Sequence, residues 1–288
     1  MSTTSESPAA PERTLPQRLA ALEADLRVRG SVLVAFSGGA DSALLLAAAV
    51  RALGAERVGA GTAYSDSLPR SERGPALDFA RGLGVRVLTP RTREMDREGY
   101  RANSGQRCYF CKAELLEVLG SLAREHGFAH VATGTNADDA VAGFRPGIRA
   151  AAERGAITPL LDAGLTKAQV RLASRQWGLP TWDKPAAACL SSRIAYGISV
   201  TPARLARVER AEVAVRAVLA EAGLPVRNLR VRDLGDRARV EVDRELVPAA
   251  EAAGVVAAAE LAGFPAAEVD PKGFRSGSMN EALAGQDA

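Results

Sequence analysis

Apolar residues along the first two thirds of the chain follow a strand pattern and a helix pattern in turn. Residues 31–36 contain a continuous apolar run from Val32 to Phe36, which is typical of a strand buried on both faces of a sheet. Further strand patterns occur at 57–65, 85–90 and 128–135. Helical apolar spacing occurs at 15–30, 41–54, 70–84, 111–127 and 166–178. This alternation predicts an α/β fold with a doubly wound, mostly parallel sheet.

The pattern changes near residue 198. A long helix over 201–223 precedes two strand patterns that read as a hairpin, then a helix and a last extended piece. This β-β-α-β order predicts a small α+β domain that serves substrate binding or oligomerisation. The expected organisation is a disordered start, a main α/β domain, the small domain and a flexible tail, over 1–13, 14–197, 198–273 and 274–288.

Composition excludes several classes of protein. The chain has 288 residues, a net charge of +3 and no basic block, so we expect no nucleic-acid partner. Its start resembles no signal peptide, and no apolar run reaches the roughly 18 residues that span a bilayer, so we expect a cytoplasmic protein without membrane contact. Only two histidines occur, His126 and His130, which we expect at a helix end and a strand start.

A loop of small residues joins the first strand to an apolar helix, with the sequence Ser37-Gly-Gly-Ala-Asp-Ser42. A helix start after a buried strand presents unpaired N–H groups, which favour phosphate. Gly38 and Gly39 allow a close approach of the backbone, and Ser37 and Ser42 add hydroxyl groups. Asp41 would repel phosphate unless a magnesium ion lies between them. The loop therefore predicts a site for a metal-bridged polyphosphate.

Known phosphate-binding motifs narrow this prediction. The Walker lysine and the dinucleotide fingerprint G-x-G-x-x-G are both missing. The loop instead resembles the pyrophosphate loop, or PP-loop, of ATP pyrophosphatases, which implies cleavage of ATP between its α and β phosphates and adenylation of a substrate oxygen. The segment "GTNADD" follows the fourth strand pattern, where Gly134 and Asp138 would contact ATP or its metal. A plain Asn/Asp turn is the alternative for this segment.

The cysteines are candidates for sulfur chemistry. Cys108-x-x-Cys111 is compatible with a redox pair, half a zinc site or two ligands of a cluster. A free cysteine such as Cys189 is often only a small buried apolar residue. Lys184 and Arg193 lie near it in sequence, however, and cations favour the reactive thiolate.

Five segments carry a more specific resemblance. The SGGADS loop, "RCYFCK", "GTNADD", "WDKPAAACLSSRIAYG" and "RVRDLGDRARVEV" occur in this order within about residues 15–275. Together they resemble the LarE family of ATP-dependent sulfur transferases. The resemblance implies a small nucleotide substrate, a pyridinium dicarboxylic acid mononucleotide, whose carboxylate is adenylated and becomes a thiocarboxylate for the nickel-pincer cofactor of lactate racemase. ATP and Mg²⁺ are the implied cofactors, and a homo-oligomer and a downstream nickel-insertion protein are the implied assembly and partner.

The resemblance also implies roles for charged residues of the second region. Arg193, Arg230 and Arg232 would bind the phosphate of the substrate. Arg230 and Arg232 alternate along a strand, so they share one face and could act as bidentate donors. A solvated arginine face is the alternative. Glu212 and Asp243 would support a metal near the reactive cysteine.

Family members differ in their source of sulfur. Some give up the sulfur of a single cysteine and end with dehydroalanine after one turnover. Others hold a 4Fe–4S cluster with three cysteines, which leaves one iron open for an external sulfide. Cys108, Cys111 and Cys189 are the three cysteines of this chain, and we favour the cluster. The alternative is that Cys189 acts alone and the other two form a structural or redox pair.

Three other functions remain open. A tRNA thiolase on the same fold would need a basic surface for tRNA. An ammonia-dependent synthetase would need a glutaminase, and the chain has no cysteine near its start to run one. A non-catalytic ATP-binding protein would release no pyrophosphate and would not need Cys189.

Overall fold

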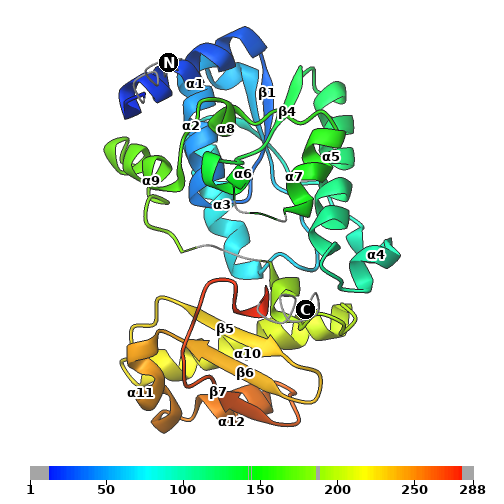
Figure 1. The fold of residues 1–288 in the computed structure, drawn as a ribbon, viewed down its shortest axis with the longest axis vertical. Coiled ribbons are helices and arrows are strands. Elements are labelled where there is room, and N and C mark those ends of the chain that lie inside the picture. Colours follow the sequence, from blue (N-terminus) through cyan, green and yellow to red (C-terminus); the bar gives the residue numbers. More distant parts are fainter. Residues whose placement is uncertain (1–12, 142, 144, 186–188, 281–288) are drawn as a thin grey trace, which may run out of the picture.

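The computed structural model describes residues 13–141, 143, 145–185 and 189–280. It has one α/β part and, at the other end, a second smaller sheet with its own helices (Figure 1). The predicted disordered start and flexible tail fall largely outside the described residues.

The first sheet has four parallel strands in the order β3-β2-β1-β4. Their bounds are β1 (Val32–Ala35), β2 (Val58–Gly61), β3 (Arg86–Leu88) and β4 (His130–Ala132). The chain winds outward from β1 to β3 and then returns to place β4 on the other side of β1. This confirms the predicted parallel α/β sheet. Ligands of such sheets bind where the winding reverses, which here is at the carboxyl ends of β1 and β4.

Helices cover both faces of this sheet (Figure 1). Val32 and Val34 pack with α1, α2 and α9, whereas Leu33 and Ala35 pack with α5 on the opposite face. The first strand is therefore buried on both faces, which explains its continuous apolar run. The helices of this part are α1 (Leu15–Arg29), α2 (Ala40–Leu53), α3 (Arg70–Gly82), α4 (Glu98–Arg101), α5 (Arg107–Glu125), α6 (Ala137–Val141), α7 (Pro146–Glu153), α8 (Pro159–Asp162) and α9 (Lys167–Gln176).

Some helix boundaries differ from the sequence pattern. Helix α5 begins at Arg107, four residues before the predicted start at Cys111. Both Cys108 and Cys111 therefore lie in its first turn, three residues apart and on the same face. The short helices α6, α7 and α8 were not predicted. His126 caps the end of α5 and His130 opens β4, as expected.

The second sheet has the order β5-β6-β7, with β5 and β6 antiparallel and β7 parallel to β6. Its strands and helices are α10 (Pro202–Glu221), β5 (Leu229–Asp233), β6 (Ala238–Val242), α11 (Val247–Ala252), α12 (Val255–Leu261) and β7 (Ala267–Val269). The predicted hairpin is confirmed. The single helix expected after it is two helices, because Gly254 adopts a left-handed conformation with φ +87°.

Residues from before the predicted boundary at 198 contribute to the hydrophobic core of the second sheet. The core of the second sheet includes Tyr100, Leu190 and Ile194, all of which precede residue 198. A separate domain that begins at residue 198 therefore stays a prediction. Within the described part of the chain, we find no helix with the length and apolar character needed to cross a bilayer.

Candidate active site

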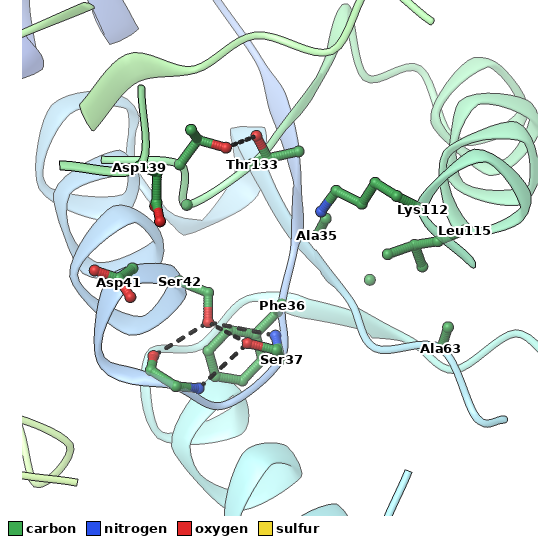
Figure 2. A pocket seen from close by; sticks show the side chains of 14 residues that line it. Ala35, Phe36, Ser37, Asp41, Ser42, Ala63, Lys112, Leu115, Thr133 and Asp139 are labelled. Carbon is green, nitrogen blue, oxygen red and sulfur yellow. Dashed lines mark hydrogen bonds between the residues drawn. The ribbon is translucent and has the colours of Figure 1, made fainter. Parts of the chain in front are cut away.

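A cavity of about 310 Å³ opens at the carboxyl ends of β1 and β4, where the winding of the sheet reverses. The end of β1, the first turn of α2, the loop after β4 and helix α5 all contribute to its lining (Figure 2). Asp41 and Ser42 of α2 lie on one side of it, and Lys112 of α5 lies on the other. The cavity therefore contains the loop that the sequence singled out.

Hydrogen bonds between its own residues shape this loop. The Ser37 and Ser42 hydroxyl oxygens lie 3.2 Å apart, and the Ser42 hydroxyl donates to the Gly39 carbonyl at 3.1 Å. Gly38 has φ +71°, and an added Cβ would lie 3.0 Å from the Ala76 Cβ. The first N–H groups of α2 have no acceptor within the helix, as at every helix start. The loop and α2 thus form an anion-binding helix N-terminus beside the cavity.

The loop after β4 lies directly against this helix start. A Cβ added to Gly134 would be 2.9 Å from the Ser42 backbone nitrogen and 3.1 Å from the Asp41 carbonyl carbon. Only glycine allows the two backbones to approach so closely. The "GTNADD" and "SGGADS" segments, far apart in sequence, therefore meet at the cavity.

The Asp41 carboxylate has two partners on neighbouring elements. The Lys167 ammonium forms an ion pair with it, and the Asn136 amide donates to it at 3.1 Å. Lys167 thus supplies positive charge beside the Asp41 carboxylate.

The two aspartates of "GTNADD" lie in different surroundings. Asp138 is exposed, and its carboxylate accepts a hydrogen bond from the Lys167 backbone N–H at 2.8 Å. Asp139 lines the cavity instead. The role predicted for Asp138 stays a prediction, and the neighbouring acid is the one that faces the cavity.

Lys112 is a functional candidate that sequence reasoning missed. Its side chain extends from α5 towards Ala35 (Figure 2), and it has no hydrogen bond or ion pair with any described residue. Burial lowers the pKa of Lys112, although negative charge on Cys111 acts against this. An unpaired amine that faces an anion-binding helix start can bind a phosphate or carboxylate. No signal in the sequence marked it, because the helix was predicted to begin only at Cys111 and a lysine near a helix start is common.

The three cysteines affect one another electrostatically. Burial and then negative charge on Cys189 raise the pKa of Cys108 and of Cys111, so the charges of the three sulfurs interact. The Cys189 sulfur lies 2.9 Å from the Ser191 hydroxyl oxygen. The described residues contain no group of three or more His, Cys, Asp or Glu side chains placed to hold a metal ion. The three thiols are the number that a cluster with one open iron requires, but the described residues do not place them as a metal site.

The cysteine segment is attached to both parts of the fold. The Leu190 N–H donates to the Ser67 carbonyl at 2.8 Å, on the side of the first sheet. The Arg232 guanidinium donates to the Ser192 carbonyl at 3.2 Å, on the side of the second sheet. These bonds fix the backbone on the carboxyl side of Cys189.

Lys184 connects the cysteine segment to the loop. Its ammonium donates to the Gly38 carbonyl at 3.0 Å and pairs with Glu72 at 2.6 Å. The residue that the sequence linked to thiolate formation therefore contacts the phosphate-binding loop.

The arginines predicted to bind the substrate phosphate come together near this segment. Arg193 pairs with Glu212 at 2.9 Å, and Arg232 pairs with Glu241 at 2.7 Å. Burial and then the charge of Arg193 lower the pKa of Arg230 to about 10. Positive charges this close favour an anionic ligand, and Arg230 is the least buried of the three.

Glu212 and Asp243 already accept hydrogen bonds from the protein. Glu212 accepts from the Val231 N–H at 3.1 Å in addition to its arginine. Burial would raise the pKa of Asp243, but hydrogen bonds from Asn228 and Arg227 outweigh it and lower the pKa. The metal role of these two acids stays a prediction.

Comparisons with known proteins agree with this geometry. No family model matches the chain. An uncharacterized protein of Synechocystis is 40% identical over 255 residues, which cover 87% of this chain and 92% of that protein. The pyridinium-3,5-bisthiocarboxylic acid mononucleotide synthase of Lactiplantibacillus plantarum is 33% identical over 272 residues, covering 94% of this chain and 96% of the synthase. The chain belongs to the LarE family, that of this synthase.

Membership in the LarE family confirms the resemblance found in the sequence. An uncharacterized protein of Methanocaldococcus jannaschii is also similar, with 27% identity over 144 residues, or half of this chain. Among the predicted ATP-binding residues, the cavity of this LarE protein is lined by Ser37, Gly39, Asp41, Ser42 and Gly134.

Proposed function

We propose that the chain is an ATP-dependent sulfur transferase that adenylates a carboxylate of a pyridinium dicarboxylic acid mononucleotide and converts it to a thiocarboxylate. One observation carries this proposal: Lys112 faces the anion-binding start of α2 across one cavity, and the adjacent residue, Cys111, belongs to the group of three thiols. The name of the Lactiplantibacillus plantarum relative supports the same product.

The first step activates the carboxylate. The triphosphate of ATP lies on the loop, where N–H groups and hydroxyls of Ser37 and Ser42 bind the β and γ phosphates. Asp41 would hold Mg²⁺, which supplies compensating charge between the carboxylate and the phosphates. A carboxylate oxygen of the substrate attacks the α phosphorus, the bond to the bridging oxygen breaks, and pyrophosphate leaves. Lys112 stabilises the negative charge that develops at the α phosphate.

The second step introduces sulfur. The Cys189 sulfur loses its proton and attacks the acyl carbon, and the bond to AMP breaks to give a thioester. Loss of the Cys189 Cα proton and cleavage of its Cβ–Sγ bond then release the thiocarboxylate and leave dehydroalanine. These bond changes need no oxidant or reductant. In the alternative route, hydrosulfide displaces AMP directly, and Cys189 is not consumed.

The three thiols bear on the choice between these routes. Cys108, Cys111 and Cys189 would hold a 4Fe–4S cluster whose open iron supplies the sulfide. The number of cysteines supports this route, whereas the described residues show no group of three placed to hold a metal ion. Arg230 would bind the substrate phosphate, with Arg193 and Arg232 held beside it by their glutamates. The small α+β domain, a homo-oligomer and a nickel-insertion partner that uses the product remain part of the proposal.

Two substitutions test the function step by step. Asp41→Ala should abolish both pyrophosphate release and thiocarboxylate formation, because the first step fails. Cys189→Ala should retain pyrophosphate release during a single turnover and lose the thiocarboxylate. Asp25→Ala, on the far helix α1, is the matched control and should leave both unchanged. Thiocarboxylate formed at the unmodified rate by correctly folded Asp41→Ala or Cys189→Ala protein would contradict the proposal.

The same preparations identify the source of sulfur. Loss of the elements of H2S from Cys189, seen in the intact mass after turnover, indicates the sacrificial route. An anaerobic preparation with about four irons per chain and an unchanged mass indicates the cluster. Adenylation of tRNA in place of the pyridinium nucleotide would favour the tRNA thiolase.

A further inference from the structure

Tyr100 is the one tyrosine in the described residues whose side chain is fully buried, with 0% exposure. Its ring belongs to the core of the second sheet, together with Leu190 and Ile194. Its hydroxyl has no hydrogen-bond partner among the described residues. Buried polar groups are nearly always paired, and an unpaired one is costly unless a ligand completes it. This hydroxyl therefore needs an explanation.

The hydroxyl groups that surround Tyr100 already contact other polar groups. The hydroxyls of Ser191 and Ser67 lie near enough to lower the pKa of Tyr100 against the effect of burial, but neither has the distance and angle of a hydrogen bond with it. The Ser191 hydroxyl contacts the Cys189 sulfur at 2.9 Å, and the Ser67 hydroxyl contacts Ser65 at 2.9 Å. Burial first, and then negative charge on Cys189 and Cys111, raise the pKa of Tyr100. Cys111 packs against the same hydrophobic core as Tyr100. The unpaired hydroxyl thus lies on the side of the thiols, where the hydroxyls around it have other partners.

Negative sulfur in this group needs hydrogen-bond donors. Glu94 is 2% exposed, and its carboxylate accepts a hydrogen bond from the Ser67 hydroxyl at 3.3 Å. A sulfur atom that gains negative charge here is therefore repelled by a buried carboxylate. A neutral O–H group can stabilise such a sulfur without adding a formal charge.

We propose that the Tyr100 hydroxyl donates a hydrogen bond to the sulfur atom that is transferred. That atom is the Cys189 sulfur as its bond to Cβ breaks, or a sulfide delivered to the same position. In both cases the sulfur carries negative charge, either as it joins the acyl group or as it leaves the Cβ atom of Cys189, and the hydrogen bond stabilises that charge. This inference rests on the proposed function and adds a donor to its second step.

Tyr100→Phe tests the inference because it removes the hydroxyl and keeps the ring. Tyr109→Phe is the matched control, since the Tyr109 hydroxyl contacts Glu153 at the surface of α5. Each full-length variant is assayed with ATP, Mg²⁺ and the pyridinium dicarboxylic acid mononucleotide in single turnover. Pyrophosphate, thiocarboxylate and the melting temperature are measured on the same preparations.

The expected result separates the two steps. Tyr100→Phe should release pyrophosphate at the unmodified rate and form thiocarboxylate about tenfold to a hundredfold more slowly, the usual effect of losing a hydrogen bond to a charged group. Its melting temperature should rise by about 2 °C or more, because an unpaired buried hydroxyl is removed. Tyr109→Phe should match the unmodified protein in both activities.

Two outcomes would overturn the inference. The first is thiocarboxylate formed by Tyr100→Phe at the unmodified rate. The second is a lower melting temperature for this variant, which would show that the hydroxyl stabilises the fold, whatever the substrate. An unmodified protein that makes neither pyrophosphate nor thiocarboxylate would instead contradict the proposed function, while the melting temperatures would still test the hydroxyl.

Discussion

Replacing Gly134 with alanine tests how closely the loop after β4 lies against the first turn of α2. The new methyl carbon would be 2.9 Å from the Ser42 nitrogen, about 0.5 Å short of the 3.4 Å at which ordinary contacts begin. The atoms it meets belong to the backbone of a helix, so no side-chain rotation relieves the contact. The loop and the helix start must therefore move apart.

The cost of this movement affects both stability and activity. Overpacking of this kind costs about 1–3 kcal/mol, which corresponds to a fall of about 2–12 °C in melting temperature for a protein of this size. Misplacing catalytic groups by about 1 Å costs about a hundredfold in rate, so a shift near half of that should slow pyrophosphate release about tenfold.

The assay compares Gly134→Ala with Gly74→Ala in thermal unfolding and in pyrophosphate release. Gly74 lies inside α3, and a Cβ there would meet no atom within 4 Å. Alanine favours a helix over glycine by about 1 kcal/mol, so this control should melt at the same temperature or higher. If Gly134→Ala melts with the unmodified protein and releases pyrophosphate at its rate, the close approach of the two segments is refuted.

Three further predictions concern single side chains. Lys112→Met should slow pyrophosphate release, and it should raise the melting temperature at neutral pH. The melting temperature should rise because burial lowers the pKa of Lys112, so its charged form is disfavoured in the fold. A lower melting temperature would contradict this prediction. Asp233→Ala should lower the free energy of unfolding, measured in urea, by about 3 kcal/mol, because it leaves two arginines without their fully buried carboxylate. The control Asp236→Ala, at an exposed position, should leave the free energy of unfolding nearly unchanged. A hydrogen bond from Arg154 lowers the pKa of Glu117, so this carboxylate stabilises the fold above its ordinary pKa of 4.5 and loses that effect as pH falls through the lowered value. Glu117→Gln should therefore melt below the unmodified protein at neutral pH and together with it in acid, and a difference that persists in acid would contradict the prediction.

Local sequence signals predicted the sheet and most of the helices around it. The buried strand at Val32–Ala35 needed only a continuous apolar run, and Thr166 with Gln169 forms the capping box expected at the start of α9. The start of α5 was missed because the residues before Cys111 have no apolar periodicity. Contacts with distant segments fix that turn instead, such as the bond of 2.9 Å from Arg107 to the Ser191 carbonyl.

The candidate site was predictable to the extent that its parts were contiguous in sequence. The loop from Ser37 to Ser42 is one segment, and its chemistry follows from its residues. Lys112 and Tyr100 became candidates only when the fold placed one in the cavity and the other beside the thiols. A lysine in a helix and a tyrosine before it carry no signal of their own, because the same residues occur in ordinary helices.

The position of Cys189 follows from the way the two sheets meet. Leu190 belongs to the core of the second sheet, yet its N–H donates to Ser67 in the first part of the chain. On the second sheet, Arg232 donates to Ser192 and is itself held by Glu241. A nucleophile fixed from both sides can be placed beside groups from either sheet, here the thiols of α5 and the arginines of β5. Under the proposed function, the sulfur and the arginines can act on one substrate because the residues after Cys189 are bonded to both parts of the fold.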